Sequence, residues 1–148
     1  MANKTIELRK DIQHLLKSIF EKTFYRRADV DTKYPYLVYT IRDVDDYKIL
    51  EIDFWDEGSN TENIENFADK VEERLDEFIK TNENHSISIF KNNDRSWVDD
   101  ENKNILRINE SFQILYYGRD SKWNLKVVTL QKLKKIYLLM QVFCSKTL

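Results

Sequence analysis

Apolar residues recur at two different spacings along this chain, and the changes of spacing predict the order of its elements. Over residues 6–20 they recur three and four positions apart, as on one face of an amphipathic helix. A clearer stretch of the same kind runs from about residue 62 to residue 80. Residues 36–41, 47–56, 87–89 and 105–117 instead alternate or are rich in β-branched and aromatic side chains, a pattern typical of strands.

Short polar segments separate the predicted elements. Asp43, Asp45 and Asp46 lie between the first two strands and predict a β-hairpin. The segment Ser59–Glu62 has the spacing of a capping box for the central helix, and Thr61 is an alternative cap. The order helix, two strands, helix, two strands predicts an α+β fold: a small antiparallel sheet of about four strands packed against two helices, plus a C-terminal extension.

Charge divides the chain into a body and a C-terminal segment. Residues 1–120 hold all 26 acidic residues but only 18 of the 24 basic residues, a net charge of −8. Residues 121–148 hold six lysines and no acid, a net charge of +6. We therefore expect an α+β domain over residues 1–120 and a basic extension over residues 121–148 that can form a helix. The extension is either an additional partner-binding helix or a segment translated outside the ancestral reading frame. The sequence leaves both interpretations open.

The composition excludes several classes of protein. Only two glycines occur in 148 residues, and no glycine-rich nucleotide loop is found. The single cysteine, Cys144, excludes an internal disulfide and fits a reducing compartment. The longest apolar run, residues 136–140, is too short to span a bilayer, and no signal peptide is recognisable. An acidic body also argues against general DNA binding, which needs clustered lysine and arginine.

The acidic residues around the predicted hairpin are the best candidate for catalytic chemistry. Divalent cations bind several carboxylates, and metal-dependent nucleases use an Asp followed by a Glu-x-Lys triplet on a neighbouring strand. The matching triplet here is Glu51–Asp53, which lacks the lysine, and neither His14 nor His85 has a zinc-ligand partner at the usual spacing. We therefore expect no metal, cofactor or catalytic site, and a solvated hairpin face. The acidic residues in question are Asp43, Asp45, Asp46, Glu51, Asp53, Asp56 and Glu57.

Four motifs in order resemble a known family of virion proteins. They are Tyr34-Pro-Tyr-Leu-Val-Tyr39, Leu50-Glu-Ile-Asp-Phe-Trp-Asp56, Thr61-x-x-Ile64-Glu65 and Tyr116-Tyr117-Gly118-Arg119, and they follow an early amphipathic helix. In this order the segments resemble the tail-terminator (head–tail joining, tail completion) family of tailed bacteriophages and prophages. The resemblance covers residues 3–119, and the chain from Ser121 onward has no counterpart in it.

The resemblance implies a structural role without catalysis. Such a protein is made in the host cytoplasm and forms a homohexameric ring at the tail–neck junction of the virion. The ring ends polymerisation of the tail tube and joins the tail to the head connector. Its partners are further copies of itself, the tail tube protein and the head connector or stopper protein. DNA only passes through the lumen, where an acidic wall would repel it, and no membrane is involved.

The residues expected at protein interfaces are aromatic or lie next to an aromatic residue. They are Tyr34, Tyr36, Trp55, Asp56 and Trp97. Three other functions stay open: a head-completion, stopper or neck protein, a metal-dependent nuclease using the acidic hairpin, and an adaptor that binds a partner through the basic C-terminal segment.

Overall fold

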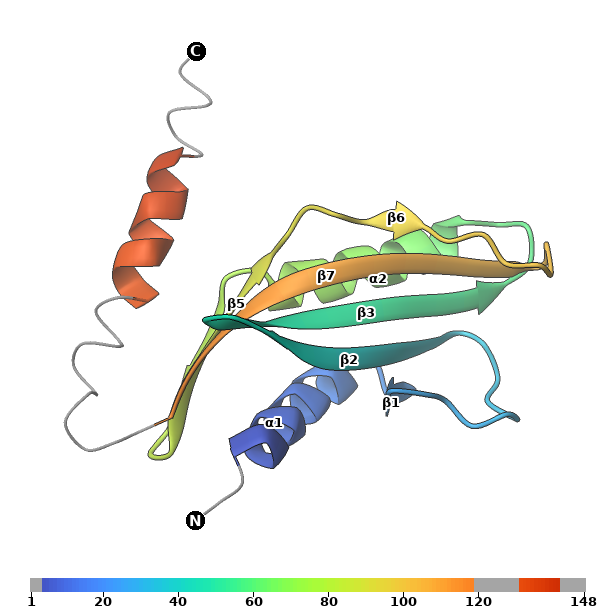
Figure 1. The fold of residues 1–148 in the computed structure, drawn as a ribbon. Coiled ribbons are helices and arrows are strands. Elements are labelled where there is room, and N and C mark those ends of the chain that lie inside the picture. Colours follow the sequence, from blue (N-terminus) through green and yellow to red (C-terminus); the bar gives the residue numbers. More distant parts are fainter. Residues whose placement is uncertain (1–3, 119–130, 142–148) are drawn as a thin grey trace.

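The computed structural model describes residues 4–118 and 131–141, which form helices around one curled sheet (Figure 1). The elements in chain order are α1 (Lys4–Ile19), β1 (Thr23–Tyr25), β2 (Tyr36–Val44), β3 (Tyr47–Glu57), α2 (Glu62–Leu75), β4 (Phe78–Thr81), β5 (His85–Lys91), β6 (Ser96–Trp97) and β7 (Ile105–Gly118). A further helix occupies residues 131–141.

The sheet is larger than the sequence predicts and mixed in direction. Its strand order is β1-β2-β3-β7-β5-β4, with β6 paired to β7 beyond that path. The β1–β2 pair is parallel, and all the other pairs are antiparallel. The expectation of a small four-stranded antiparallel sheet against two helices is therefore wrong: the described residues contain seven strands and three helices. Strands β4 and β6 have four and two residues, too few for the alternation of apolar and polar positions to be recognised.

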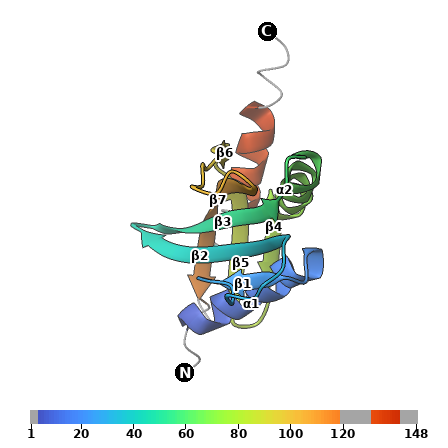
Figure 2. The same ribbon diagram turned by 90° about the vertical axis from the view of Figure 1, so that its right-hand side faces the viewer.

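Both α1 and α2 pack on the same face of the sheet and share one core with it. Figure 1 shows α1 below the sheet and α2 behind it, and Figure 2 shows the strands curling around the two helices. The alternation of each strand sends every second side chain into this core. The fully buried strand residues with the largest side chains are Leu37, Tyr39, Leu50, Ile52, Phe54, Ile87 and Phe112.

The hairpin predicted from the acidic turn is confirmed, whereas the predicted end of the central helix is wrong. Strands β2 and β3 pair from Tyr36↔Trp55 to Val44↔Tyr47, which leaves Asp45 and Asp46 as the turn. Helix α2 ends at Leu75 instead of continuing to residue 80. Glu77 has a positive φ of 59°, and the chain then reverses into β4. Phe78 continues the helical spacing while packing on the same core from a strand, so periodicity alone extends the helix too far.

The start of α2 is capped by a residue that the sequence did not indicate. Thr61 occupies the N-cap position, but its side chain makes no capping hydrogen bond. The amide of Glu62 instead donates to the Asn60 side-chain oxygen at 3.0 Å. The capping box expected over Ser59–Glu62 is therefore not the device that begins this helix.

Helix α1 is joined to the far side of the sheet by polar contacts as well as by the core. Lys80 Nζ lies 3.0 Å from Asp11 Oδ1, and His85 Nε2 bonds the other oxygen of the same carboxylate. His85 is buried at the start of β5 and its ring lies 5.4 Å from that of Tyr116. These contacts fix the direction of α1 across β4, β5 and β7.

The helix at residues 131–141 lies against the other face of the sheet, beside β5. Gln131 is buried and its Oε1 accepts a hydrogen bond from Ser86 Oγ at 2.8 Å. The remainder of the predicted extension, residues 121–130 and 142–148, lies outside the described residues, so the domain boundary near residue 120 stays a prediction. Among the residues that are described, no helix has the length and apolar character needed to cross a membrane.

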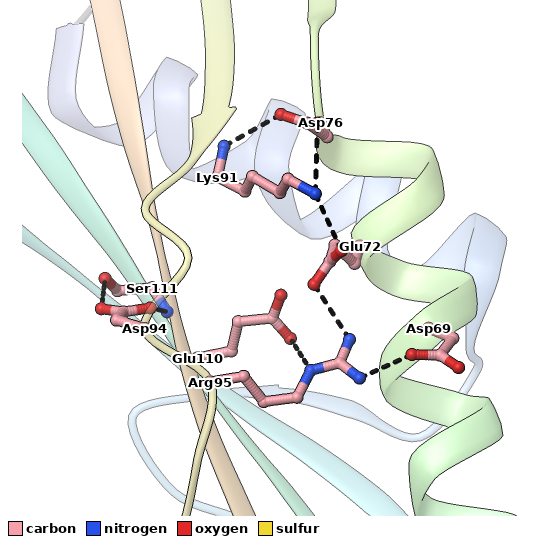
Figure 3. A network of polar contacts seen from close by, with 8 residues as sticks. All are labelled: Asp69, Glu72, Asp76, Lys91, Asp94, Arg95, Glu110 and Ser111. Atoms are coloured by element: carbon pink, nitrogen blue, oxygen red, sulfur yellow. Dashed lines mark hydrogen bonds and ion pairs between the residues drawn. The ribbon is translucent and has the colours of Figure 1, made fainter. Parts of the chain in front are cut away.

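A network of charged side chains holds α2 and the segment before β6 onto β7 (Figure 3). Arg95 is the hub: its guanidinium contacts Asp69 at 2.5 Å, Glu72 at 3.0 Å and Glu110 at 3.3 Å. Lys91 Nζ reaches the second oxygen of Glu72 at 3.2 Å. Because Glu110 is only 2% exposed on the core face of β7, losing Arg95 would leave a buried oxygen of its side chain without this hydrogen-bond donor.

The two glutamates of this network have pKa values displaced in opposite directions. Burial, followed by the adjacent Glu72 carboxylate, raises the pKa of Glu110 from 4.5 to about 8. The Glu110 carboxyl, together with Lys91 and Arg95, lowers the pKa of Glu72. At neutral pH the folded protein therefore retains a proton on Glu110 that the unfolded chain has lost.

This difference makes stability fall as pH rises. Between the ordinary pKa of 4.5 and about 8 the folded state binds more protons at Glu110 than the unfolded state, so the free energy of unfolding decreases with pH. Glu110→Gln removes that titration. We predict that, in urea unfolding followed by circular dichroism, wild type loses stability relative to Glu110→Gln across this window. Asp69→Asn is the control, because it touches the same guanidinium but keeps Glu110, and it should retain the wild-type slope. Parallel curves for wild type and Glu110→Gln would contradict the assignment.

Candidate protein interface

A row of stacked aromatic rings crosses the sheet on the face opposite the helical core. The rings of Tyr34 and Tyr36 lie 5.2 Å apart with an interplanar angle of 23°, and those of Tyr36 and Trp55 lie 5.9 Å apart at 17°. Phe24 approaches Tyr36 edge-on at 6.3 Å. The parallel β1–β2 pair and the antiparallel β2–β3 pair produce this row, because they place Phe24, Tyr36 and Trp55 on one face.

Arg107 of β7 completes the row from the next strand. Its register partner is Trp55, and its guanidinium carbon lies 4.6 Å from the centre of the indole ring. The same guanidinium donates to Asp53 Oδ1, with Nε at 3.0 Å and Nη2 at 2.9 Å. Asn109 Nδ2 donates to that oxygen as well, at 3.0 Å. Arg107 is therefore held flat on the indole by a carboxylate on the neighbouring strand.

An open groove of about 370 Å³ runs along this row. Its floor is formed by side chains of β2, β3 and β7, and its rim is formed by residues 26–30 after β1, among them Arg26 and Arg27. The Nε1 atom of Trp55 is buried and has no hydrogen-bond partner among the described residues. Burial, together with the adjacent Tyr34, raises the pKa of Tyr36 above its ordinary value.

The row has the composition that is typical of the centre of a protein interface. Tyrosine, tryptophan and arginine are the residues enriched at the centres of protein interfaces, where each adds large contact area at small conformational cost. The row lies on three paired strands, so little ordering would be needed on binding. Because stacking covers the faces of Tyr36 and Trp55, the row presents ring edges on the floor and arginines at the rim, a combination suited to an apolar partner surface bordered by acidic groups.

The structure brings together three of the five residues that the sequence suggested for interfaces. Tyr34, Tyr36 and Trp55 are half-buried members of the row. Asp56 lies on the core face, is only 7% exposed, and accepts a hydrogen bond from the Glu57 amide at 2.8 Å. Trp97 lies in β6 opposite Ile108, apart from the row, and is 49% exposed.

Arg107 and the arginines of the rim were missed by sequence reasoning. The alternation of the last strand places Arg107 on the face opposite Leu106 and Ile108, which is a readable signal. Its contact with Trp55 depends on the β3–β7 register, which alternation does not determine. Arg26 and Arg27 stand in an irregular segment, where no periodicity indicates which face they border.

The acidic residues of the hairpin do not converge on one point. Asp53 and Asp56 lie on opposite faces of β3, and Asp43 forms an ion pair with Lys48 at the far end of the hairpin. Within residues 4–118 and 131–141 no group of three or more His, Cys, Asp or Glu side chains has the geometry to hold a metal ion.

No protein-family model matches this chain, and no curated protein sequence matches it significantly.

The contacts of Arg107 predict a measurable contribution to stability. Arg107→Gln removes the cation–π contact with Trp55 and the ion pair with Asp53, both partly shielded from water. We expect the free energy of unfolding, measured in urea, to fall by about 1–2 kcal/mol.

The matched control is Arg42→Gln on the same face. Arg42 Nε lies 3.9 Å from Glu51, and both side chains are well exposed, at 62% and 40%. An exposed pair of this kind contributes at most about 0.5 kcal/mol. Equal losses for the two variants would show that the row is not a cohesive unit.

Proposed function

We propose that this protein is a tail terminator of a tailed phage or prophage: a structural virion protein without catalytic activity. In this proposal a homohexameric ring of the chain caps the head-proximal end of the tail tube, ends its polymerisation and joins it to the head connector. The motif order that resembles the tail-terminator family supports the proposal, and so does the kind of surface that the sheet presents.

The observation that carries the proposal is the aromatic row on the outer face of the sheet. Tyr34, Tyr36 and Trp55 stack in sequence, and Arg107 covers the last ring. A subunit that works by assembly needs such a rigid, half-buried surface with apolar area and fixed donors. We assign this row to a contact with a neighbouring component of the particle.

Charge also fits a ring around DNA. The body carries a net charge of −8 over residues 1–120, so a lumen lined by it would repel the phosphate backbone. Passing DNA would then meet no strong binding site on the wall, since phosphate contacts require clustered lysine and arginine. The same charge distribution is unfavourable for a nuclease.

The direct test is electron microscopy of lysates from a phage or prophage that encodes this chain, with its gene deleted. We predict filled heads without tails, beside free tails of irregular and often excessive length, because nothing stops the tube. Free tails of normal length would assign the protein to a stopper, head-completion or neck role instead. Intact particles would remove it from tail assembly.

A point variant tests whether the row carries the function. We predict that Trp55→Ala reproduces the deletion phenotype, because it removes the ring on which Tyr36 and Arg107 both stack. Glu83→Ala, in the exposed turn between β4 and β5, is the control and should give normal particles. Normal particles from a folded Trp55→Ala protein would exclude the row from the assembly contact.

A further inference from the structure

The helix at residues 131–141 exposes most of its apolar side chains, and only Leu138 among them is half-buried against the body. Leu133, Ile136, Tyr137 and Met140 follow a spacing of three and four residues, and each is 52–62% exposed. We call these four residues the apolar stripe. An isolated surface helix normally buries such a stripe, so this arrangement leaves its main hydrophobic area without a partner among the described residues.

The opposite side of the same helix makes the contacts with the subunit's own sheet. Gln131 bonds Ser86, Lys134 Nζ lies 5.2 Å from the ring centre of Phe90, and Lys135 Nζ lies 3.9 Å from Glu77. Ser86 and Ser88 provide a small-residue floor on β5 beneath the helix. Open grooves of about 450 and 380 Å³ remain on the two sides of the helix, so its seat on the sheet is incompletely filled.

A complementary surface exists elsewhere on the same chain, at the β6 edge. Trp97 is the only tryptophan of the described residues classed as exposed, at 49%, and it is followed by the acidic run Asp99, Asp100 and Glu101. The segment that leads into this edge is held in place: Arg95 contacts α2 and β7, and Asp94 accepts a hydrogen bond from the Ser111 amide at 2.8 Å (Figure 3). We call Trp97 with residues 99–101 the acidic edge.

Charge selects the partner of the apolar stripe. The segment that contains the helix carries +6 over residues 121–148, with no acid, whereas residues 1–120 carry −8. Two stripes packed against each other would bring two lysine-rich segments together, at a cost from like-charge repulsion. Packing a stripe on the acidic edge instead places apolar area on Trp97 and the exposed Lys132, which borders the stripe, beside Asp99 and Glu101.

We propose that the apolar stripe of one subunit docks on the acidic edge of a second copy of this chain. The contact is head-to-tail, because the two surfaces differ, and repetition of it generates a ring or a filament. The inference rests on the proposed function in one respect: it supplies the subunit-to-subunit contact that a terminator ring needs. It assigns to that contact a segment that the family resemblance does not cover.

Complementary variants of the full-length chain test the contact in sedimentation velocity. Ile136→Asp destroys the stripe but keeps the acidic edge, and Trp97→Asp does the reverse. Each substitution replaces an exposed side chain, and circular dichroism verifies the fold. We expect wild type to self-associate as its concentration rises. Each variant alone should associate at least about thirtyfold more weakly, as for the loss of a central interface residue. A mixture of the two variants should form a dimer and nothing larger, because only one intact pair of surfaces remains.

The matched control lies on the same helix. Leu139 is 50% exposed but falls outside the stripe, so Leu139→Asp should associate like wild type. Association should also weaken as salt is raised, because the lysines and the acidic run attract each other across the contact.

Three results would overturn the inference. They are a wild type that stays monomeric at its highest soluble concentration, a Trp97→Asp variant that associates like wild type, and a mixture that forms no dimer. The second result would indicate stripe-to-stripe pairing. None of these results decides the outcome of the gene-deletion experiment, because a ring can still form with the tail tube as its template. Intact particles after deletion would in turn reject the terminator function and leave this contact standing.

Discussion

The antiparallel pairing of β3 with β7 is the contact on which the rest of the structure depends. It aligns Lys48–Glu57 with Ile105–Ile114 and places two long strands at the centre of the sheet. Strand β7 then continues to pair with β5 and β6, so one strand joins both halves of the chain. A register slip of one residue would exchange the two faces of β7, sending Arg107 into the core and Ile108 into solvent. Such a slip is unfavourable because it would expose the apolar side chains of β7 and bury its polar ones.

The fixed register gives the two faces of the sheet separate tasks. The inner face buries the apolar residues against α1 and α2 and contains one buried acidic group on β7, Glu110, to which Arg95 donates a hydrogen bond. The outer face then needs no apolar core of its own and can carry the aromatic row. Stability and binding are thereby assigned to opposite sides of the same strands. A substitution in the row is expected to impair assembly far more than folding.

Sequence reasoning succeeded where a segment was long and periodic. Helix α1, the β2–β3 hairpin and the long strand β7 follow from spacing and from the Asp45–Asp46 turn. It failed for β4 and β6, whose four and two residues hold no period, and for the end of α2, where Glu77 turns the chain without a glycine or proline. The parallel β1–β2 pair and the size of the sheet depend on long-range pairing that local pattern does not contain.

The same limit applies to the candidate interface. Tyr36 and Trp55 are readable as outward residues from the alternation of β2 and β3, and Tyr34 precedes them beside the only proline. Asp56 follows Trp55 in the chain, but the alternation of β3 places it on the core face. Being next to Trp55 in the sequence therefore did not place Asp56 at the candidate interface. Arg107 joins the row only through the β3–β7 register. The helix at residues 131–141 likewise exposes its apolar stripe because it contacts Ser86 of β5 through Gln131. Which residues of β5 face this helix depends on strand pairing, which the local pattern does not contain.

The central claim is that this chain acts at one end of a tail tube. The most direct test adds gold-labelled purified protein to tail tubes taken from the deletion lysate and locates the label by electron microscopy. The account predicts label at one end of each tube, the end that receives the head, with saturation and with loss of binding for Trp55→Ala. Label along the tube wall, at the opposite tip, or on no tube at all would contradict it.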